Sequence, residues 1–168
     1  ELLCELSLKN KNWNYLGIEI RKKLVLNANL KMKSKENKNL YFSFGNANNL
    51  FDHSKNKSII DFITSISFNF PDPWFKKKHH KRRVIQPKLI NCLSNSMKTG
   101  SLIFIKTDVR ELFDHMELTI SESINFKKLG NDNLIFCDSF NPNRIQTNRE
   151  KYVISNQLEI YESIYQKI

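Results

Sequence analysis

The chain has 168 residues, 40% of them hydrophobic and 26% charged, which is the composition of an ordinary globular domain. An aromatic content of 11% argues against intrinsic disorder, and no apolar run approaches the roughly 18 residues that span a membrane. The formal net charge is +10, and residues 76–83 carry six of the 27 Lys and Arg. This concentrated charge favours a polyanionic partner, nucleic acid ahead of a membrane surface, with a solvated charged loop as the alternative.

The three cysteines, Cys4, Cys92 and Cys137, lie far apart in the sequence. No CxxC pair or other metal-ligand spacing is present, so we expect neither a disulfide framework nor a zinc site. We therefore expect a metal-free protein in a reducing compartment, the cytoplasm.

Predicted strands and helices alternate along the chain. The helices are predicted at residues 1–8, 21–34, 84–97 and 109–124, the third with Pro87 in its first turn. The strands are predicted at residues 14–20, 40–46, 63–70, 101–108 and 158–168. Because most of the strands are continuous apolar runs, the pattern predicts an α/β fold with a parallel sheet covered by helices on both faces.

Polar residues follow several predicted strands. Glu19, Asn46 and Asp108 end three of them, and Asp72 follows a fourth. Ligands of open α/β sheets bind beyond the carboxyl ends of the strands, where one carboxylate can accept both ribose hydroxyls and an amide can read an adenine edge. Glu19 and Asn46 suit these two roles. Taken singly, the acids also suit helix caps and Asn46 a turn.

The stretch FPDPW places Asp72 between two prolines, which restrict the backbone and present the carboxylate with little freedom. Trp74 and Phe75 offer flat faces that stack on a ligand or anchor the loop in the core. The basic run that follows would meet phosphates while Asp72 faces the base. His79 and His80 fit RNA contacts or structural roles better than a metal site, because no second ligand pair is in sight.

These segments together resemble a known family. FPDPWFKKKHHKRRVIQP (70–87), GIEIR (17–21), GNAN (45–48), KTD (106–108) and TNREKY (147–152) are similar, in order and spacing, to the signature of bacterial tRNA (guanine-N7)-methyltransferases. The resemblance covers essentially the whole chain. It implies a Rossmann-like class I methyltransferase, a three-layer α/β sandwich with a mostly parallel sheet. It also implies S-adenosylmethionine as cofactor and, as substrate, the variable-loop guanosine at tRNA position 46.

The resemblance also assigns roles to individual residues. Asp72 would be catalytic, and the cofactor would be bound by Glu19, Asn46, Ala47 and Asp72. Many relatives carry Asp at the position of Asn46. Substrate contacts would come from Lys76, Asp108, Thr147, Asn148, Arg149 and Glu150. RNA contacts would come from Lys78, His79, His80, Lys81, Arg82 and Arg83.

The start of the sequence departs from the family pattern. Residues 1–8 read as a helix without an N-cap, and the first strand and Gly-rich turn of the family would precede residue 1. We therefore expect a single methyltransferase domain over residues 1–168, truncated at its N-terminus and lacking that strand and turn. The expected partner is tRNA, not a membrane, and the expected state is a monomer or homodimer. The competing interpretation is a non-catalytic tRNA-binding fragment or subunit with a methyltransferase-like fold.

Overall fold

The computed structural model describes residues 2–50, 61–130, 141 and 145–168. The helices are α1 (Leu2–Lys9), α2 (Lys22–Ser34), α3 (Ala47–Leu50), α5 (Pro87–Ser96), α6 (Arg110–Ser121) and α8 (Asn148–Ser155), with a 3-10 helix η2 at Lys77–Arg82. The strands are β1 (Tyr15–Glu19), β2 (Leu40–Phe44), β3 (Ser65–Asn69), β4 (Leu102–Thr107), β5 (Phe126–Lys128) and β6 (Tyr161–Lys167). None of these helices is long and apolar enough to cross a membrane.

The helices and strands predicted from the sequence are all present, and α5 begins at Pro87 as its position predicts. Four further elements, α3, η2, β5 and α8, were not predicted as such. Glu1 of the predicted first helix and Cys137 lie outside the described residues.

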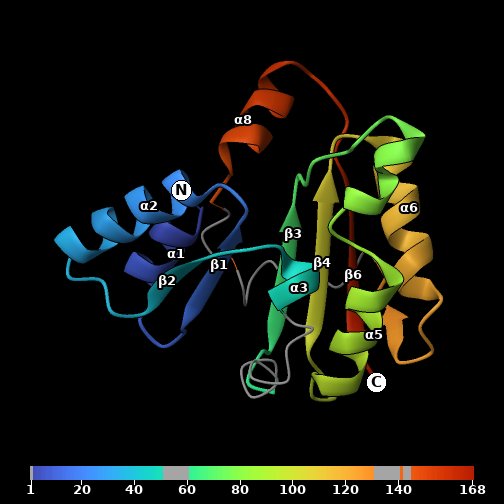
Figure 1. Ribbon diagram of the computed structural model, residues 1–168, viewed down its shortest axis with the longest axis horizontal. Coiled ribbons are helices and arrows are strands. Elements are labelled where there is room, and N and C mark those ends of the chain that lie inside the picture. Colours follow the sequence, from blue (N-terminus) through green and yellow to red (C-terminus); the bar gives the residue numbers. More distant parts are fainter. Residues whose placement is uncertain (1, 51–60, 131–140, 142–144) are drawn as a thin grey trace.

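The strands form two sheets (Figure 1). β1 and β2 pair in parallel, and the second sheet has the order β3-β4-β6-β5. β3 and β4 are also parallel, whereas β6 runs antiparallel to β4 and to β5. The arrangement is thus mixed α/β, with four of the strands in two parallel pairs. In the described part of the chain, no strand joins the two-stranded sheet to the four-stranded sheet.

The main core lies between the four-stranded sheet and helices α5 and α6, which are side by side in Figure 1. Alternate residues of β4 point to opposite faces, so Ile103 and Ile105 face this core while Lys106 lies on the other face, toward α8. The other buried members are Ala47, Ile85, Leu89, Ile90, Leu93, Met97, Leu112, Phe113, Met116, Ile120, Phe126 and Tyr165.

A smaller core joins α1 and α2 to the two-stranded sheet, around Leu6, Tyr15 and Leu40. Its packing explains the glycine of the GIEIR segment. A Cβ on Gly17 would lie 2.4 Å from the Phe42 ring, a contact that real side chains do not make. Glycine at this position therefore leaves room for the Phe42 ring against β1, two residues before Glu19.

One polar cluster joins α6 to β5 and β6 at the edge of the sheet. The Glu117 carboxylate accepts hydrogen bonds from Lys128, Ser163 and Tyr165, the last at 3.1 Å. Burial alone would raise the Glu117 pKa, but these hydrogen bonds and the Lys128 charge outweigh burial and lower it. Since the folded state favours the ionised carboxylate, protonation of Glu117 favours unfolding.

We expect Glu117→Ala to lower the free energy of unfolding by roughly 1–3 kcal/mol at pH 7, because three donors lose their acceptor. The contribution of Glu117 is present at neutral pH and disappears as the pH falls below about 4. Urea titrations at pH 7 and at acidic pH measure both effects. The matched control is Glu122→Ala, at the exposed end of the same helix. Equal losses for the two variants, or a Glu117 effect that grows in acid, would contradict this assignment.

Candidate active site

The carboxyl ends of the parallel strands carry the polar residues predicted from the sequence. Glu19 ends β1, Asn46 follows β2, Asp72 follows β3 and Asp108 follows β4. Two backbone hydrogen bonds join neighbouring strand ends, from Gly45 N to Glu19 O at 3.1 Å and from Phe70 N to Lys106 O at 2.7 Å. Each pair of strands therefore delivers its polar residues to one sheet edge, as parallel pairing requires.

Glu19 forms a two-point ion pair with Arg21. Nε and a terminal nitrogen of Arg21 donate to the two carboxylate oxygens at 2.9 and 3.0 Å. This pairing holds the pKa of the Glu19 carboxyl below its ordinary value. The pKa of Arg21 is raised, mainly by Glu19 and to a smaller extent by the charge of Asp72.

Asn46 and Ala47 lie at the start of α3. The Asn46 side-chain oxygen accepts the Asn48 backbone N–H at 2.9 Å, so the turn interpretation and the ligand interpretation of this residue are compatible. Ala47 is buried in the main core, which leaves only its backbone for a ligand. Asn48 in turn donates to the Val84 carbonyl at 2.9 Å and so links this segment to the end of the basic run.

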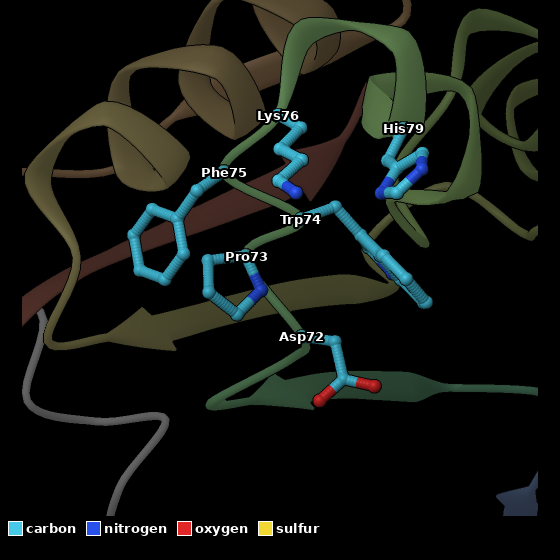
Figure 2. A pocket seen from close by; sticks show the side chains of 6 residues that line it. All are labelled: Asp72, Pro73, Trp74, Phe75, Lys76 and His79. Carbon is cyan, nitrogen blue, oxygen red and sulfur yellow. The ribbon is translucent and has the colours of Figure 1, made fainter.

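Asp72 projects from a strained turn. Phe70 and Trp74, on either side of the PDP sequence, both have φ of 47°, a left-handed conformation that costs energy for a bulky residue. The Asp72 side chain is exposed and makes no hydrogen bond or ion pair to the described part of the chain. It lines an open pocket with Pro73, Trp74, Phe75, Lys76 and His79 (Figure 2).

The aromatic residues of this pocket point in different directions. Figure 2 shows Trp74 and His79 on one side of the backbone and Phe75 on the other. Trp74 meets the His79 ring edge-on at 5.7 Å between centroids, and the Arg82 guanidinium lies 5.0 Å from the Trp74 ring centre. Trp74 is thus held against η2, whereas Phe75 is 68% exposed and presents a free face.

The basic run forms η2 and its flanks. Lys76, Lys78, Lys81 and Arg82 are exposed, as a surface for phosphates requires, and His79 and His80 are half-buried. Arg83 is different, since it is only 2% exposed and bonded within the protein. The RNA contact of Arg83 stays a prediction, and this burial does not support it, because the guanidinium is directed at groups of the protein.

Helix α8 is fixed at the carboxyl end of β4. Thr147 and Glu150 form a capping box, in which the Thr147 hydroxyl accepts the Glu150 N–H at 3.0 Å. Glu150 also accepts from Lys106 Nζ at 2.9 Å, and Arg149 pairs with Asp108. Burial alone would lower the Lys106 pKa, but Glu150 and Glu162 outweigh burial and raise it. Four predicted substrate residues, Thr147, Arg149, Glu150 and Asp108, are thus brought together.

Three participants were missed by the sequence reasoning. Arg21 lies inside a quoted motif, two residues from its partner Glu19, and this spacing was an available signal. Lys106 also lies inside a quoted motif, but its partner Glu150 is 44 positions away and gave no signal. Glu111, which pairs with Arg83, gave no signal, because it is separated from that partner by 28 positions. Within the described ranges, no group of three or more His, Cys, Asp or Glu could hold a metal ion.

The fold is shared with solved methyltransferases of low sequence identity. An aminoglycoside resistance methyltransferase aligns with a TM-score of 0.60 and 11% identity, over all of this chain and 82% of its own. An antibiotic-related methyltransferase also gives 0.60, with 16% identity, over 99% of this chain and 82% of its own. The predicted Rossmann-like methyltransferase fold is confirmed.

Sequence comparison gives the family. A family model described as putative methyltransferase matches residues 1–163. A protein named tRNA (guanine-N(7)-)-methyltransferase from Prochlorococcus marinus subsp. pastoris is 83% identical over all of this chain and 80% of its own length. A protein of the same name from Prochlorococcus marinus strain MIT 9313 is 36% identical over 98% of this chain and 70% of its own length. The chain belongs to this methyltransferase family, and a merely RNA-binding role is not favoured.

We expect Thr147→Ala to lower the free energy of unfolding by about 1 kcal/mol, because the α8 cap loses its acceptor. Thr147→Ser keeps the hydroxyl and should retain most of the stability. Urea denaturation of the three proteins measures this, and an alanine variant as stable as the serine variant would show that the capping box contributes nothing.

Proposed function

We propose that this chain is a tRNA (guanine-N7-)-methyltransferase that transfers the methyl group of S-adenosylmethionine to N7 of the variable-loop guanosine at position 46. The observation that carries this proposal is the placement of Asp72. It is an exposed carboxylate without a partner in the described structure, presented by a rigid turn between the strand ends and the basic run. A guanosine held beside Asp72 would have the phosphates of the adjoining RNA backbone within reach of η2.

The strand-end residues fit the cofactor. The Glu19 carboxylate suits the ribose hydroxyls, because a carboxylate is ionised at neutral pH and then only accepts hydrogen bonds. The exposed Asn46 amide keeps its NH2 group free of partners in the described part of the chain, so it can donate to an adenine nitrogen. Bound in this way, S-adenosylmethionine supplies an electrophilic methyl group.

Methyl transfer to N7 needs little general acid or base catalysis from the protein. N7 of guanine carries an available lone pair, so no proton must leave before the methyl group is attacked. The protein's tasks are to orient the guanine in line with the methyl group and to offset the positive charge that develops on the purine. This agrees with a site built from carboxylates and rigid turns.

Asp72 is the acid best suited to these tasks. Glu19, Asp108 and Glu150 are each paired with a cation, from Arg21, Arg149 and Lys106 respectively. The Asp72 carboxylate can accept hydrogen bonds from guanine N1–H and the 2-amino group without breaking an existing pair. Its negative charge would also stabilise the methylated purine.

Residues around Asp72 suit the RNA. Phe75 offers an exposed ring on which a base can stack, and Lys76 lies beside it in the same pocket. The Asp108–Arg149 and Lys106–Glu150 pairs place α8 at the same edge, where the first turn of the helix can approach the guanosine. The exposed Lys78, Lys81 and Arg82 side chains would bind phosphates.

We expect Asp72→Ala and Asp72→Asn to lower the rate of methyl transfer to tRNA roughly 100-fold or more, with the fold intact. The asparagine variant keeps the shape but places an N–H donor where an acceptor is needed. Labelled methyl incorporation at saturating tRNA measures the rate, and circular dichroism checks the fold. Glu122→Ala is the control for loss of an exposed acid, and wild-type turnover in both Asp72 variants would remove Asp72 from the mechanism.

We expect the triple variant Lys78→Ala, Lys81→Ala and Arg82→Ala to weaken tRNA binding and to flatten its salt dependence. Each lost phosphate contact should reduce the slope of log K against log salt by about 0.7–0.9. Filter binding over a range of salt concentrations measures the slope. Replacement of Lys31, Lys33 and Lys35 on and after α2 is the control for the same loss of charge, and equal slopes for the two triple variants would show that η2 is not a specific RNA surface.

A further inference from the structure

Arg83 is a charged side chain buried in the middle of a basic surface. Its neighbours Lys81 and Arg82 are exposed, whereas Arg83 is 2% exposed. Burying a guanidinium is costly unless its N–H groups find acceptors. The identity of those acceptors indicates what Arg83 does.

Three residues surround the Arg83 guanidinium. Nε donates to the Pro73 carbonyl at 2.9 Å, and a terminal nitrogen donates to Glu111 at 2.7 Å. The same nitrogen lies 3.0 Å from His80 Nε2. His80 Nε2 also lies 3.5 Å from a Glu111 carboxylate oxygen. Arg83 in turn holds the pKa of the Glu111 carboxyl below its ordinary value.

The Pro73 carbonyl belongs to the turn that presents Asp72. That turn runs between Phe70 and Trp74, both in left-handed conformations that a bulky residue does not adopt without support. At its start, Phe70 N is bonded to Lys106 O of β4. Within the described residues, the bond from Arg83 to Pro73 O is the other backbone anchor between Phe70 and Trp74.

We propose that Arg83 is a positioning residue for the methyl-transfer site: its guanidinium holds the Asp72–Pro73–Trp74 turn by the Pro73 carbonyl and is itself held by Glu111 of α6. This inference rests on the proposed function for its effect on rate. The geometry of the anchor stands independently of the reaction.

The contacts distinguish this role from phosphate binding. A phosphate-binding arginine needs N–H groups accessible from solvent, and Arg82, which lies beside Trp74, is an exposed residue. Arg83 Nε donates to the Pro73 carbonyl and one terminal nitrogen lies against Glu111 and His80, while Gln86 donates to the Arg83 carbonyl at 3.0 Å. A shift of the turn by about 1 Å would misplace Asp72, and misplacement on that scale can cost on the order of 100-fold in rate.

The test compares two adjacent arginines. Arg83→Met should lower the single-turnover rate constant of methyl transfer, with enzyme in saturating excess over tRNA, by about 10- to 100-fold and leave the salt slope of tRNA binding unchanged. Arg82→Met should reduce the salt slope by about 0.7–0.9. While the folded enzyme remains in saturating excess, the single-turnover rate constant does not depend on the fraction of folded protein, so general destabilisation does not imitate the expected result. A reduced slope with an unchanged rate for Arg83→Met would overturn the proposal.

A second variant covers the case in which Arg83→Met does not fold. Glu111 is largely exposed, so Glu111→Ala removes the support of Arg83 without emptying the core. We expect about a 3- to 10-fold lower single-turnover rate constant with the salt slope unchanged. A wild-type rate for Glu111→Ala would overturn the part of the proposal that concerns Glu111. If Arg83→Met also does not fold, a wild-type rate for Glu111→Ala would overturn the whole proposal.

A measurement without turnover separates this proposal from the proposed function. The chain has two tryptophans, so in a Trp13→Phe background the fluorescence reports on Trp74 alone. Arg83→Met, or Glu111→Ala if needed, should increase the quenching of Trp74 by acrylamide. If the wild-type protein methylates no tRNA but quenching rises, the proposed function fails and the anchor stands. If quenching is unchanged, the anchor fails whatever the wild-type activity.

Discussion

The parallel pairing of β3 with β4 is the constraint on which the site depends. Asn69 lies opposite Lys106 in the register, and Phe70 N is bonded to the Lys106 carbonyl, so the two strands end at the same level. Asp72 leaves one strand and Asp108 the other at a common edge. Lys106 of β4 forms an ion pair with Glu150 of α8. On the opposite face of β4, Ile103 and Ile105 pack in the core with α5 and α6. A slip of one residue would exchange these two faces of the strand.

Much of the fold could be predicted because the strands and longer helices carry strong apolar patterns. The short elements could not, for physical reasons. β5 has three residues and buries only Phe126, and α8 buries only Val153, so neither has a periodic apolar face. The α8 start did carry a readable signal, the T-x-x-E capping box at Thr147. The antiparallel direction of β6 depends on long-range pairing that a local pattern does not specify.

The candidate site could be predicted from the sequence where its residues lie at the ends of predicted strands. The acids were found because they follow apolar runs, and the PDP turn because prolines restrict the backbone. Apart from the local Glu19–Arg21 pair, the sequence cannot tell which of these acids are paired, since Arg149 and Lys106 meet Asp108 and Glu150 only in the folded structure. Nor does a run such as KKKHHKRR distinguish its members, and only the fold shows that Arg83 turns inward to Pro73 and Glu111.

The most direct test of the proposed activity measures labelled methyl transfer from S-adenosylmethionine to two matched tRNAs. One carries guanosine at variable-loop position 46, and the other carries 7-deazaguanosine there, which keeps the hydrogen-bonding edge but lacks the N7 lone pair. We expect label in the first tRNA and none in the second. Equal labelling of both would contradict transfer to N7 of that guanosine, and labelling of neither would contradict the proposed activity of this chain.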